Sequence, residues 1–257
     1  MKKCAKKHVS HGRQDNCKVC DVHAHIVPYV DDGAIDFYMA MDVVREAYAQ
    51  GAKGIVCTSH NGYNANEYFN SLLSLQEQVA EEGLDIRLYP GCEIYCNSDE
   101  IYNIVLDLNG NVIPTMNETK YVLIEFGPHV QISEMVYCIN YLHDFGYKTI
   151  IAHVERYHVL YSSKQWIKLL KKMGCLFQVN AYSFVDTEDK QAKKFARYLL
   201  QEKMISFIGS DTHGTDYRPH MVINGINYIY ENCDEEYAKD ICYRNAQNML
   251  NMNEEAV

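Results

Sequence analysis

Short apolar runs alternate with longer amphipathic stretches along most of this chain, and that alternation limits the folds it can adopt. The runs, rich in β-branched and aromatic residues, span 18–24, 54–60, 86–94, 121–126, 149–154, 175–180 and 205–211. The stretches between them favour helices, notably at 35–50, 66–82, 131–145, 163–173 and 187–203. Four helices precede a glycine suited to a left-handed C-terminal cap, namely Gly51, Gly83, Gly146 and Gly174. Seven strand–helix alternations predict a mainly parallel sheet covered by helices, either open and doubly wound or formed into a barrel.

Polar side chains follow or end each apolar run. They are His23 and His25, His60, Glu93, Glu125, His153, Asn180, and Asp211 with His213. The carboxyl ends of all strands of a β/α barrel meet at one mouth, whereas an open sheet spreads them along an edge. We therefore predict an α/β barrel, and 257 residues suit one such domain.

Two kinds of position suggest metal ligands. His23 and His25 lie two apart on an extended chain, so their side chains point the same way. Glu93 and Glu125 are embedded in apolar strands, where a carboxylate without a cation or hydrogen bonds costs several kcal/mol. In the loop PYVDDGA after the first strand, Asp32 and Asp31 are rival ligands.

Five histidines and four carboxylates exceed the needs of one ion and suggest two or three metals, with Mn²⁺, Fe²⁺ or Zn²⁺ suited to such ligands. Closely spaced metals fit phosphate-ester hydrolysis by metal-activated hydroxide. Arg156 and Arg218, near His153 and His213, are predicted to bind phosphate oxygens. The candidate proton donors are His158 and His220, with solvated loop positions as the alternative. No cysteine precedes an arginine by six residues, which excludes the cysteine-dependent phosphatase mechanism.

The composition narrows the partners and the compartment. A formal net charge of −10 argues against binding nucleic acid, and no apolar stretch is long enough for membrane insertion. Without a secretory signal, the ten cysteines are expected to be reduced thiols in the cytoplasm. Residues 1–17 predict a flexible basic tail before a barrel domain at 18–257. An alternative for the tail is a small zinc site from Cys4, His8, His11, Cys17 and Cys20.

Several motifs together resemble the PHP (polymerase and histidinol phosphatase) family. DVHAHIVPYVDDG, TSH, GCEIY, YVLIEF, IAHVERY, QVN and SDTHG-x-x-x-RP occur in family order over about residues 19–250. AHVERY and LIEF make the chain most similar to the protein-tyrosine phosphatases of Gram-positive capsule and exopolysaccharide operons.

That resemblance implies a distorted (β/α)7 TIM-like barrel that holds three divalent ions. Mn²⁺ is the favoured metal, and Fe, Zn and Mg are the alternatives. By the family pattern, one ion is bound by His23, His25, Glu93 and Asp211. Glu93 bridges to a second ion, bound also by Glu125 and His153, while Asp32, His60 and His213 bind the third. Arg156 and Arg218 match the family's phosphate-binding arginines.

The implied partner is the phosphotyrosine tail of a cognate bacterial tyrosine kinase that regulates polysaccharide synthesis. Two alternatives stay open at this point. One is a PHP phosphatase acting on histidinol phosphate or another small ester, and the other is a metal-loaded binding protein without catalysis.

Overall fold

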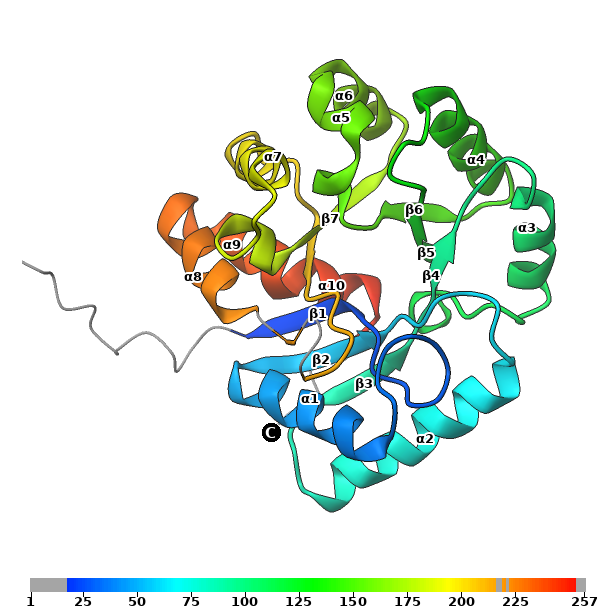
Figure 1. The fold of residues 1–257 in the computed structure, drawn as a ribbon, viewed down its shortest axis with the longest axis vertical. Coiled ribbons are helices and arrows are strands. Elements are labelled where there is room, and N and C mark those ends of the chain that lie inside the picture. Colours follow the sequence, from blue (N-terminus) through cyan, green and yellow to red (C-terminus); the bar gives the residue numbers. More distant parts are fainter. Residues whose placement is uncertain (1–17, 216–218, 221, 253–257) are drawn as a thin grey trace, which may run out of the picture.

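Helices surround a central set of parallel strands in this protein (Figure 1). The computed structural model describes residues 18–215, 219–220 and 222–252, so the predicted tail lies outside the described residues. The strands are β1 (Val19–Ala24), β2 (Ala52–Cys57), β3 (Arg87–Pro90), β4 (Glu93–Tyr95), β5 (Tyr121–Glu125), β6 (Lys148–Ile151), β7 (Leu176–Asn180) and β8 (Phe207–Gly209).

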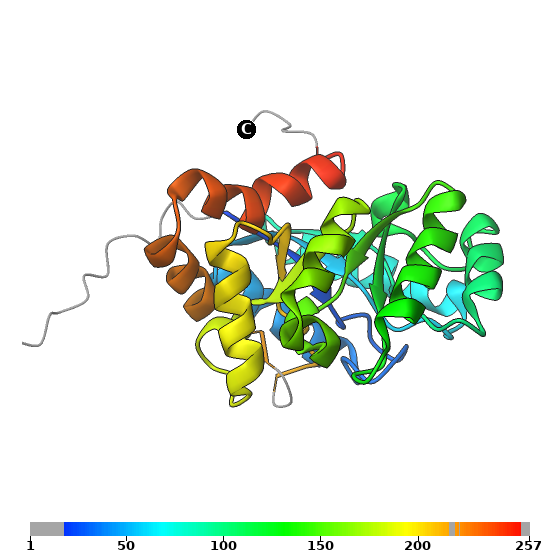
Figure 2. The same ribbon diagram turned by 90° about the horizontal axis from the view of Figure 1, so that it is seen from above.

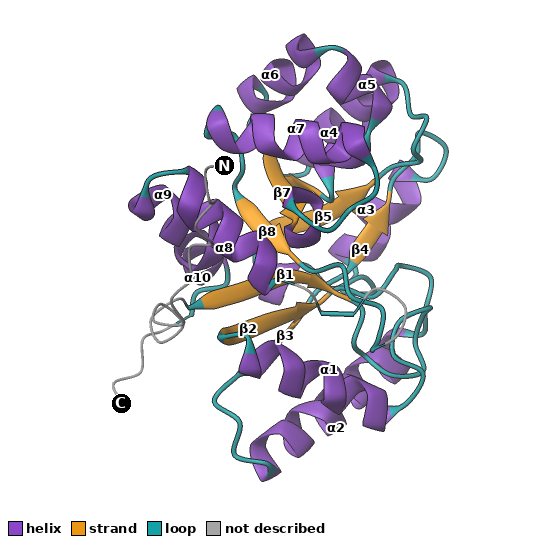
Figure 3. Cartoon of the chain, turned by 60° about the vertical axis from the view of Figure 1, so that its left-hand side comes forward, coloured by secondary structure: helices purple, strands orange, loops and turns teal. Residues whose placement is uncertain are grey.

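The helices lie between and after the strands, and they form the outer layer in Figure 3. They are α1 (Phe37–Ala49), α2 (Ala65–Glu81), α3 (Ile101–Asn109), α4 (Ile132–Asp144), α5 (His158–Ser162), α6 (Lys164–Lys172), α7 (Lys190–Gln201), α8 (Ile223–Asn232), α9 (Glu235–Lys239) and α10 (Asn245–Met249). Short helical turns η2 (Met116–Glu118), η3 (Val154–Arg156), η4 (Ala181–Phe184) and η5 (Asp240–Arg244) complete the described chain.

Helix positions agree with the sequence pattern. The stretches predicted at 35–50, 66–82, 131–145, 163–173 and 187–203 form α1, α2, α4, α6 and α7. The predicted capping glycines have positive φ values, 89° at Gly51, 67° at Gly83, 84° at Gly146 and 95° at Gly174. Glycine adopts this left-handed conformation without a steric penalty, so it ends each helix where the pattern placed it.

The third apolar run differs from the prediction because it forms two strands. Gly91 and Cys92 separate β3 from β4, and a Cβ atom at Gly91 would lie 2.6 Å from Val56 Cγ1. The chain thus passes closely over β2 at a position that only glycine fits. No helix intervenes between β3 and β4, so seven strand–helix units remain.

The strands form two parallel sheets, β1-β2-β3 and β4-β5-β6-β7-β8. Near the carboxyl ends, backbone hydrogen bonds link them on both sides. On one side the Asp211 amide donates to the His23 carbonyl over 2.7 Å, and on the other the Glu93 amide donates to the Ser59 carbonyl over 3.2 Å. The arrangement is that of a distorted TIM-like α/β fold, as predicted.

The inner faces of the strands build a small core, which α10 covers. Val22, Val56, Leu123 and Phe207 from four different strands pack in one cluster with Met249 of α10. Figure 2 shows η5 and α10 lying across the sheets on the side away from the loop between β1 and α1. The amino ends of the strands are therefore closed off by apolar packing, and the carboxyl ends are left for polar chemistry.

Candidate metal centre

Four buried donor atoms converge at the carboxyl end of β1. His23 Nε2 and His25 Nε2 lie 3.2 Å apart, and Glu93 Oε2 is 3.1 Å from each of them. Asp211 Oδ1 completes the group, 3.6 Å from His23 Nε2 and 3.8 Å from His25 Nε2. All four side chains are at most 2% exposed, so water cannot satisfy them.

The other ring nitrogens of this histidine pair leave the facing nitrogens available to bind a cation. His23 Nδ1 lies 3.1 Å from Gln178 Oε1, and His25 Nδ1 lies 2.8 Å from Asp31 Oδ2. Both oxygens accept hydrogen bonds, so each Nδ1 donates, and each Nε2 of a neutral ring presents its lone pair to the centre. Two lone pairs and two carboxylate oxygens directed at one place fit a divalent cation.

A second group lies toward solvent, and it distinguishes the two rival aspartates. Asp32 Oδ1 is 3.6 Å from His60 Nε2 and 3.5 Å from His213 Nε2, and these three residues with His25 could hold an ion. Asp31 instead accepts hydrogen bonds from His25 and from the His60 amide. Asp32 therefore lies among the candidate ligands, whereas Asp31 orients them.

The third group contains Glu93 and Glu125. His60 Nδ1 is 3.5 Å from Glu93 Oε2 and 3.4 Å from Glu125 Oε1, and His153 Nε2 is 2.8 Å from Glu93 Oε1 and 3.6 Å from Glu125 Oε2. The structure thus gathers all nine predicted ligands, and the Glu93 carboxylate contacts four of the five histidines directly.

Two of these residues adopt backbone conformations that are rare for side chains of their kind. His153 has φ of 29° and Asp211 has φ of 54°, both in the left-handed region. Such conformations cost about 1–3 kcal/mol each and persist where the surrounding structure imposes them. Both side chains are directed into the cluster, which is consistent with strain held at a functional site.

Arg156 is the predicted arginine that the structure places at this cluster. Its Nη2 donates to Asp211 Oδ2 over 2.6 Å and also to the hydroxyl of Tyr182. Arg218 lies outside the described residues. Neither candidate proton donor is at the centre, since exposed His158 pairs with Ser162 and fully buried His220 pairs with Asp21.

Two residues of the site, Gln178 and Tyr182, were missed from sequence, and Asp31 was weighed only as a metal ligand. All three act by hydrogen bonding. Asp31 and Gln178 orient the histidine rings, and Tyr182 binds Arg156. A signal existed for Gln178 alone, because it lies two residues before Asn180 on β7 and so faces the same side.

Protonation at the cluster follows from burial and mutual charge. Burial raises the pKa of Glu93, but His23, His153 and His25 outweigh it and hold that pKa well below its usual value. For Glu125, burial and then the charge of Glu93 raise the pKa to about 7. For His25, burial lowers the pKa, but Asp31 and Glu93 prevail and raise it to about 10.

Metal affinity is therefore expected to fall as the pH falls. At pH 7 a cation must displace the proton of His25, and below pH 7 it must increasingly displace one from Glu125 as well. The apparent Kd for Mn²⁺ should rise about tenfold from pH 8 to pH 7 and more steeply from pH 7 to pH 6. Calorimetric titration in two buffers of different ionisation enthalpy measures the protons released. A constant Kd over this range would contradict the prediction.

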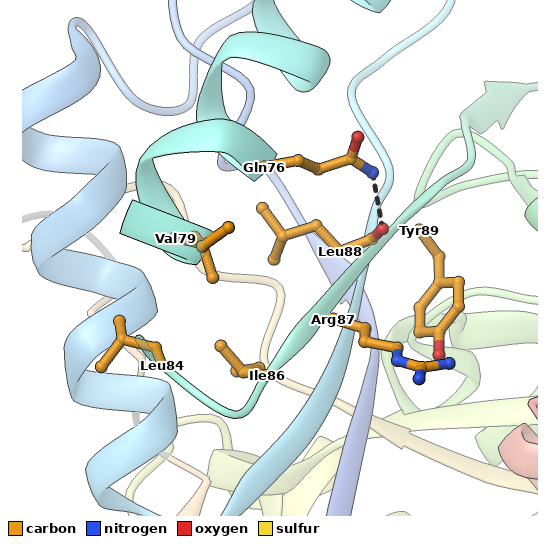
Figure 4. A pocket seen from close by; sticks show the side chains of 8 residues that line it. Gln76, Val79, Leu84, Ile86, Arg87, Leu88 and Tyr89 are labelled. Atoms are coloured by element: carbon orange, nitrogen blue, oxygen red, sulfur yellow. Dashed lines mark hydrogen bonds between the residues drawn. The ribbon is translucent and has the colours of Figure 1, made fainter. Parts of the chain in front are cut away.

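A separate hollow between α2 and β3 has a different character (Figure 4). Val79, Leu84, Ile86 and Leu88 supply an apolar lining, and Gln76 Nε2 at its rim donates to the Leu88 carbonyl over 2.9 Å. None of the nine predicted ligands lines it. This hollow therefore has no part in the chemistry of the cluster.

Parallel strands whose carboxyl ends bring nine histidine, aspartate and glutamate side chains together define a metal-dependent enzyme of the α/β class. The family model for capsular polysaccharide synthesis, CpsB/CapC, matches residues 19–251. The chain belongs to this CpsB/CapC family.

Curated relatives agree with the family model. The tyrosine-protein phosphatase CpsB of Streptococcus agalactiae is 31% identical over 240 residues, which cover 90% of this chain and 97% of the relative. The tyrosine-protein phosphatase YwqE of Bacillus subtilis is 30% identical over 235 residues, covering 89% of each chain.

Solved structures extend the comparison. A matching chain comes from the crystal structures of two metal-dependent tyrosine phosphatases, YwqE of Bacillus subtilis and CpsB of Streptococcus pneumoniae. Its TM-score is 0.81 at 26% identity, and the match covers 90% of this chain and 94% of that chain. Histidinol phosphate phosphatase of Lactococcus lactis shares the fold, with a TM-score of 0.58 at 17% identity and coverage of 84% and 94%. Among the described residues, no helix has the length and apolar character needed to cross a membrane.

Proposed function

We propose that this chain is a metal-dependent protein-tyrosine phosphatase. The observation that carries the proposal is the single Glu93 carboxylate in contact with four histidines, with Arg156 hydrogen-bonded beside it to Asp211. A donor set this large, with a guanidinium at its edge, suits a substrate whose phosphoryl group carries several negative oxygens. The relatives named tyrosine-protein phosphatase support phosphotyrosine as that substrate.

In this proposal the nine residues bind three divalent ions, and Mn²⁺ is the preferred metal. His23, His25, Glu93 and Asp211 hold one ion, Glu93, Glu125 and His153 the second, and Asp32, His60 and His213 the third. Bound there, such ions would supply a water of lowered pKa and neutralise charge on the phosphoryl oxygens. The donor groupings support three positions, although His60 also lies beside Glu93 and Glu125.

The protein's own groups bind and orient the substrate. Within the described residues, the hydrogen bonds of Arg156 start from Nη2, which leaves the rest of the guanidinium for phosphoryl oxygens. Asp211 holds this guanidinium in place, and we propose that Arg218 also binds phosphoryl oxygens. The exposed Asp32 and the partly exposed His60 mark the side from which we propose that substrate enters.

We further propose the phosphotyrosine tail of a bacterial tyrosine kinase that regulates capsule or exopolysaccharide synthesis as the partner, and the cytoplasm as the compartment. The family's description as capsular polysaccharide synthesis supports the first part. Seven of the eight described cysteines are buried, where a reduced thiol packs as a small hydrophobic group, which fits a reducing compartment.

A comparison of two substrates tests this function. Protein stripped with a chelator and reloaded with Mn²⁺ is expected to hydrolyse a phosphotyrosine peptide with kcat/KM at least about a hundredfold above that for histidinol phosphate, about 2.7 kcal/mol in barrier. Stripped protein should show only background rates. A preference for histidinol phosphate would move the chain to the small-molecule alternative. No turnover of either substrate by fully loaded protein would make it a binding protein.

A further inference from the structure

The hydroxyl of Tyr182 lies at the metal cluster without being a candidate ligand. It accepts a hydrogen bond from Arg156 Nη2 and another, over 3.2 Å, from Asn180 Nδ2. The same two nitrogens donate to Asp211 Oδ2, over 2.6 and 3.1 Å. Tyr182 and the predicted ligand Asp211 therefore share both of their donors, and the phenol is half-buried at the edge of the site.

The direction of these hydrogen bonds follows from the network behind them. The His153 amide can only donate, and it does so to Gln178 Oε1 over 2.7 Å. Gln178 Nε2 then donates to Asn180 Oδ1 over 2.8 Å, so the Asn180 amide must present its Nδ2 to Tyr182. Both lone pairs of the Tyr182 oxygen are occupied by donors, and among the described residues its own O–H makes no hydrogen bond to an acceptor.

We propose that Tyr182 is the general acid of this enzyme, donating its hydroxyl proton to the leaving oxygen of the substrate. This inference rests on the proposed phosphatase function. Water oxygen forms a bond to phosphorus while the bond from phosphorus to the phenolic oxygen breaks and its electron pair stays on that oxygen. The Tyr182 proton passes to this oxygen, which releases tyrosine. A proton from the attacking water, returned through solvent, restores Tyr182, so the products are a phenol and phosphate.

The surroundings of Tyr182 suit that role. After proton transfer its oxygen is negative, and it then faces the Arg156 guanidinium and the Asn180 amide, both already directed at it. Charge-assisted hydrogen bonds of this kind are about twice as strong as neutral ones. The donor and the leaving group of phosphotyrosine are both phenols, so the proton passes between oxygens of the same chemical kind. His158 and His220 contact neither the cluster nor Arg156.

The variant Tyr182→Phe removes the hydroxyl alone. Substrates with different leaving groups then distinguish proton donation by Tyr182 from the positioning of Arg156. For a phosphotyrosine peptide, whose leaving phenol has a pKa of about 10, kcat should fall about a hundredfold. For p-nitrophenyl phosphate, whose leaving group needs little protonation, kcat should change by less than about threefold. Across a series of aryl phosphates, the dependence of log kcat on leaving-group pKa should become steeper in the variant. Inhibition by inorganic phosphate, which has no leaving group, should be unchanged.

Each other outcome overturns the inference in a recognisable way. Equal losses on both substrates, with weaker phosphate inhibition, would mean that Tyr182 only positions Arg156. An unchanged kcat for the peptide would remove Tyr182 from the reaction. Failure of the unaltered enzyme on both substrates would instead refute the phosphatase function. Tyr137→Phe, which alters an exposed tyrosine on α4, is the matched control, and metal content and Tm of both variants verify folding.

Discussion

Replacing Glu93 by Gln is expected to lower kcat/KM for an aryl phosphate by about 10³-fold, about 4 kcal/mol in barrier. Its Oε2 lies 3.1 Å from both His23 Nε2 and His25 Nε2, and its Oε1 lies 2.8 Å from His153 Nε2. A neutral amide keeps the shape but presents an N–H to one of these nitrogens, where a cation needs an anionic donor. Steady-state kinetics with p-nitrophenyl phosphate measure the loss of kcat/KM, and elemental analysis of the purified protein measures its metal content.

The metal content should decrease together with activity, because Glu93 contributes to more than one of the donor groups. Glu77→Gln changes an exposed glutamate of α2 in the same chemical way and should leave kinetics and metal content as they are. If Glu93→Gln keeps its full metal content and activity, the shared-carboxylate arrangement is wrong.

The second large effect is expected on stability, at His220. This side chain is fully buried, and its Nε2 donates over 3.0 Å to Asp21 Oδ2, which is also fully buried. Asp21 Oδ1 accepts from the amides of His23 and Ser210, so this carboxylate links β1 to the end of β8. His220→Ala leaves Oδ2 without a partner in the described structure. We expect a loss of about 3 kcal/mol in unfolding free energy, or roughly 6–12 °C in Tm.

Chemical denaturation and thermal melting of the metal-free protein measure this effect without interference from ligand binding. His129→Ala removes an exposed histidine and should change the free energy of unfolding by no more than about 0.5 kcal/mol. In an Asp21→Asn background, His220→Ala should cost less, because the stranded charge is gone. Equal costs in both backgrounds would show that the contact does not stabilise the fold.

The positions of helices and strands could be predicted because their signals are local. Apolar periodicity and a capping glycine are read within one turn or one strand, so α1, α2, α4, α6 and α7 appeared where expected. The break between β3 and β4 was missed because its cause is a contact of Gly91 with Val56 on the neighbouring strand. No local pattern contains that contact.

The candidate ligands were equally predictable, for a topological reason. Parallel strands bring their carboxyl ends to one place, so polar residues that end separate apolar runs must meet there. That rule located eight of the nine candidate ligands between His23 and His213, and the family pattern added Asp32; all nine lie at the cluster. It could not separate Asp31 from Asp32, since the two are adjacent in one loop and differ only in the direction each side chain takes.

Hydrogen bonds between segments that are distant in the sequence could not be predicted from it. Tyr182 was one of 21 tyrosines, and its position at the site depends on Arg156, 26 residues away. His220 was weighed as a proton donor or a solvated loop residue, and it is neither, because it is buried against Asp21, 199 residues away. The alternation of strands and helices, the helix caps and the strand ends depend on neighbouring residues in the sequence. These local patterns determine the architecture and the set of candidate ligands. The orientation of each ring and carboxylate, and with it the assignment of roles, depends on which loops fold back against each other, and only packing in three dimensions establishes that.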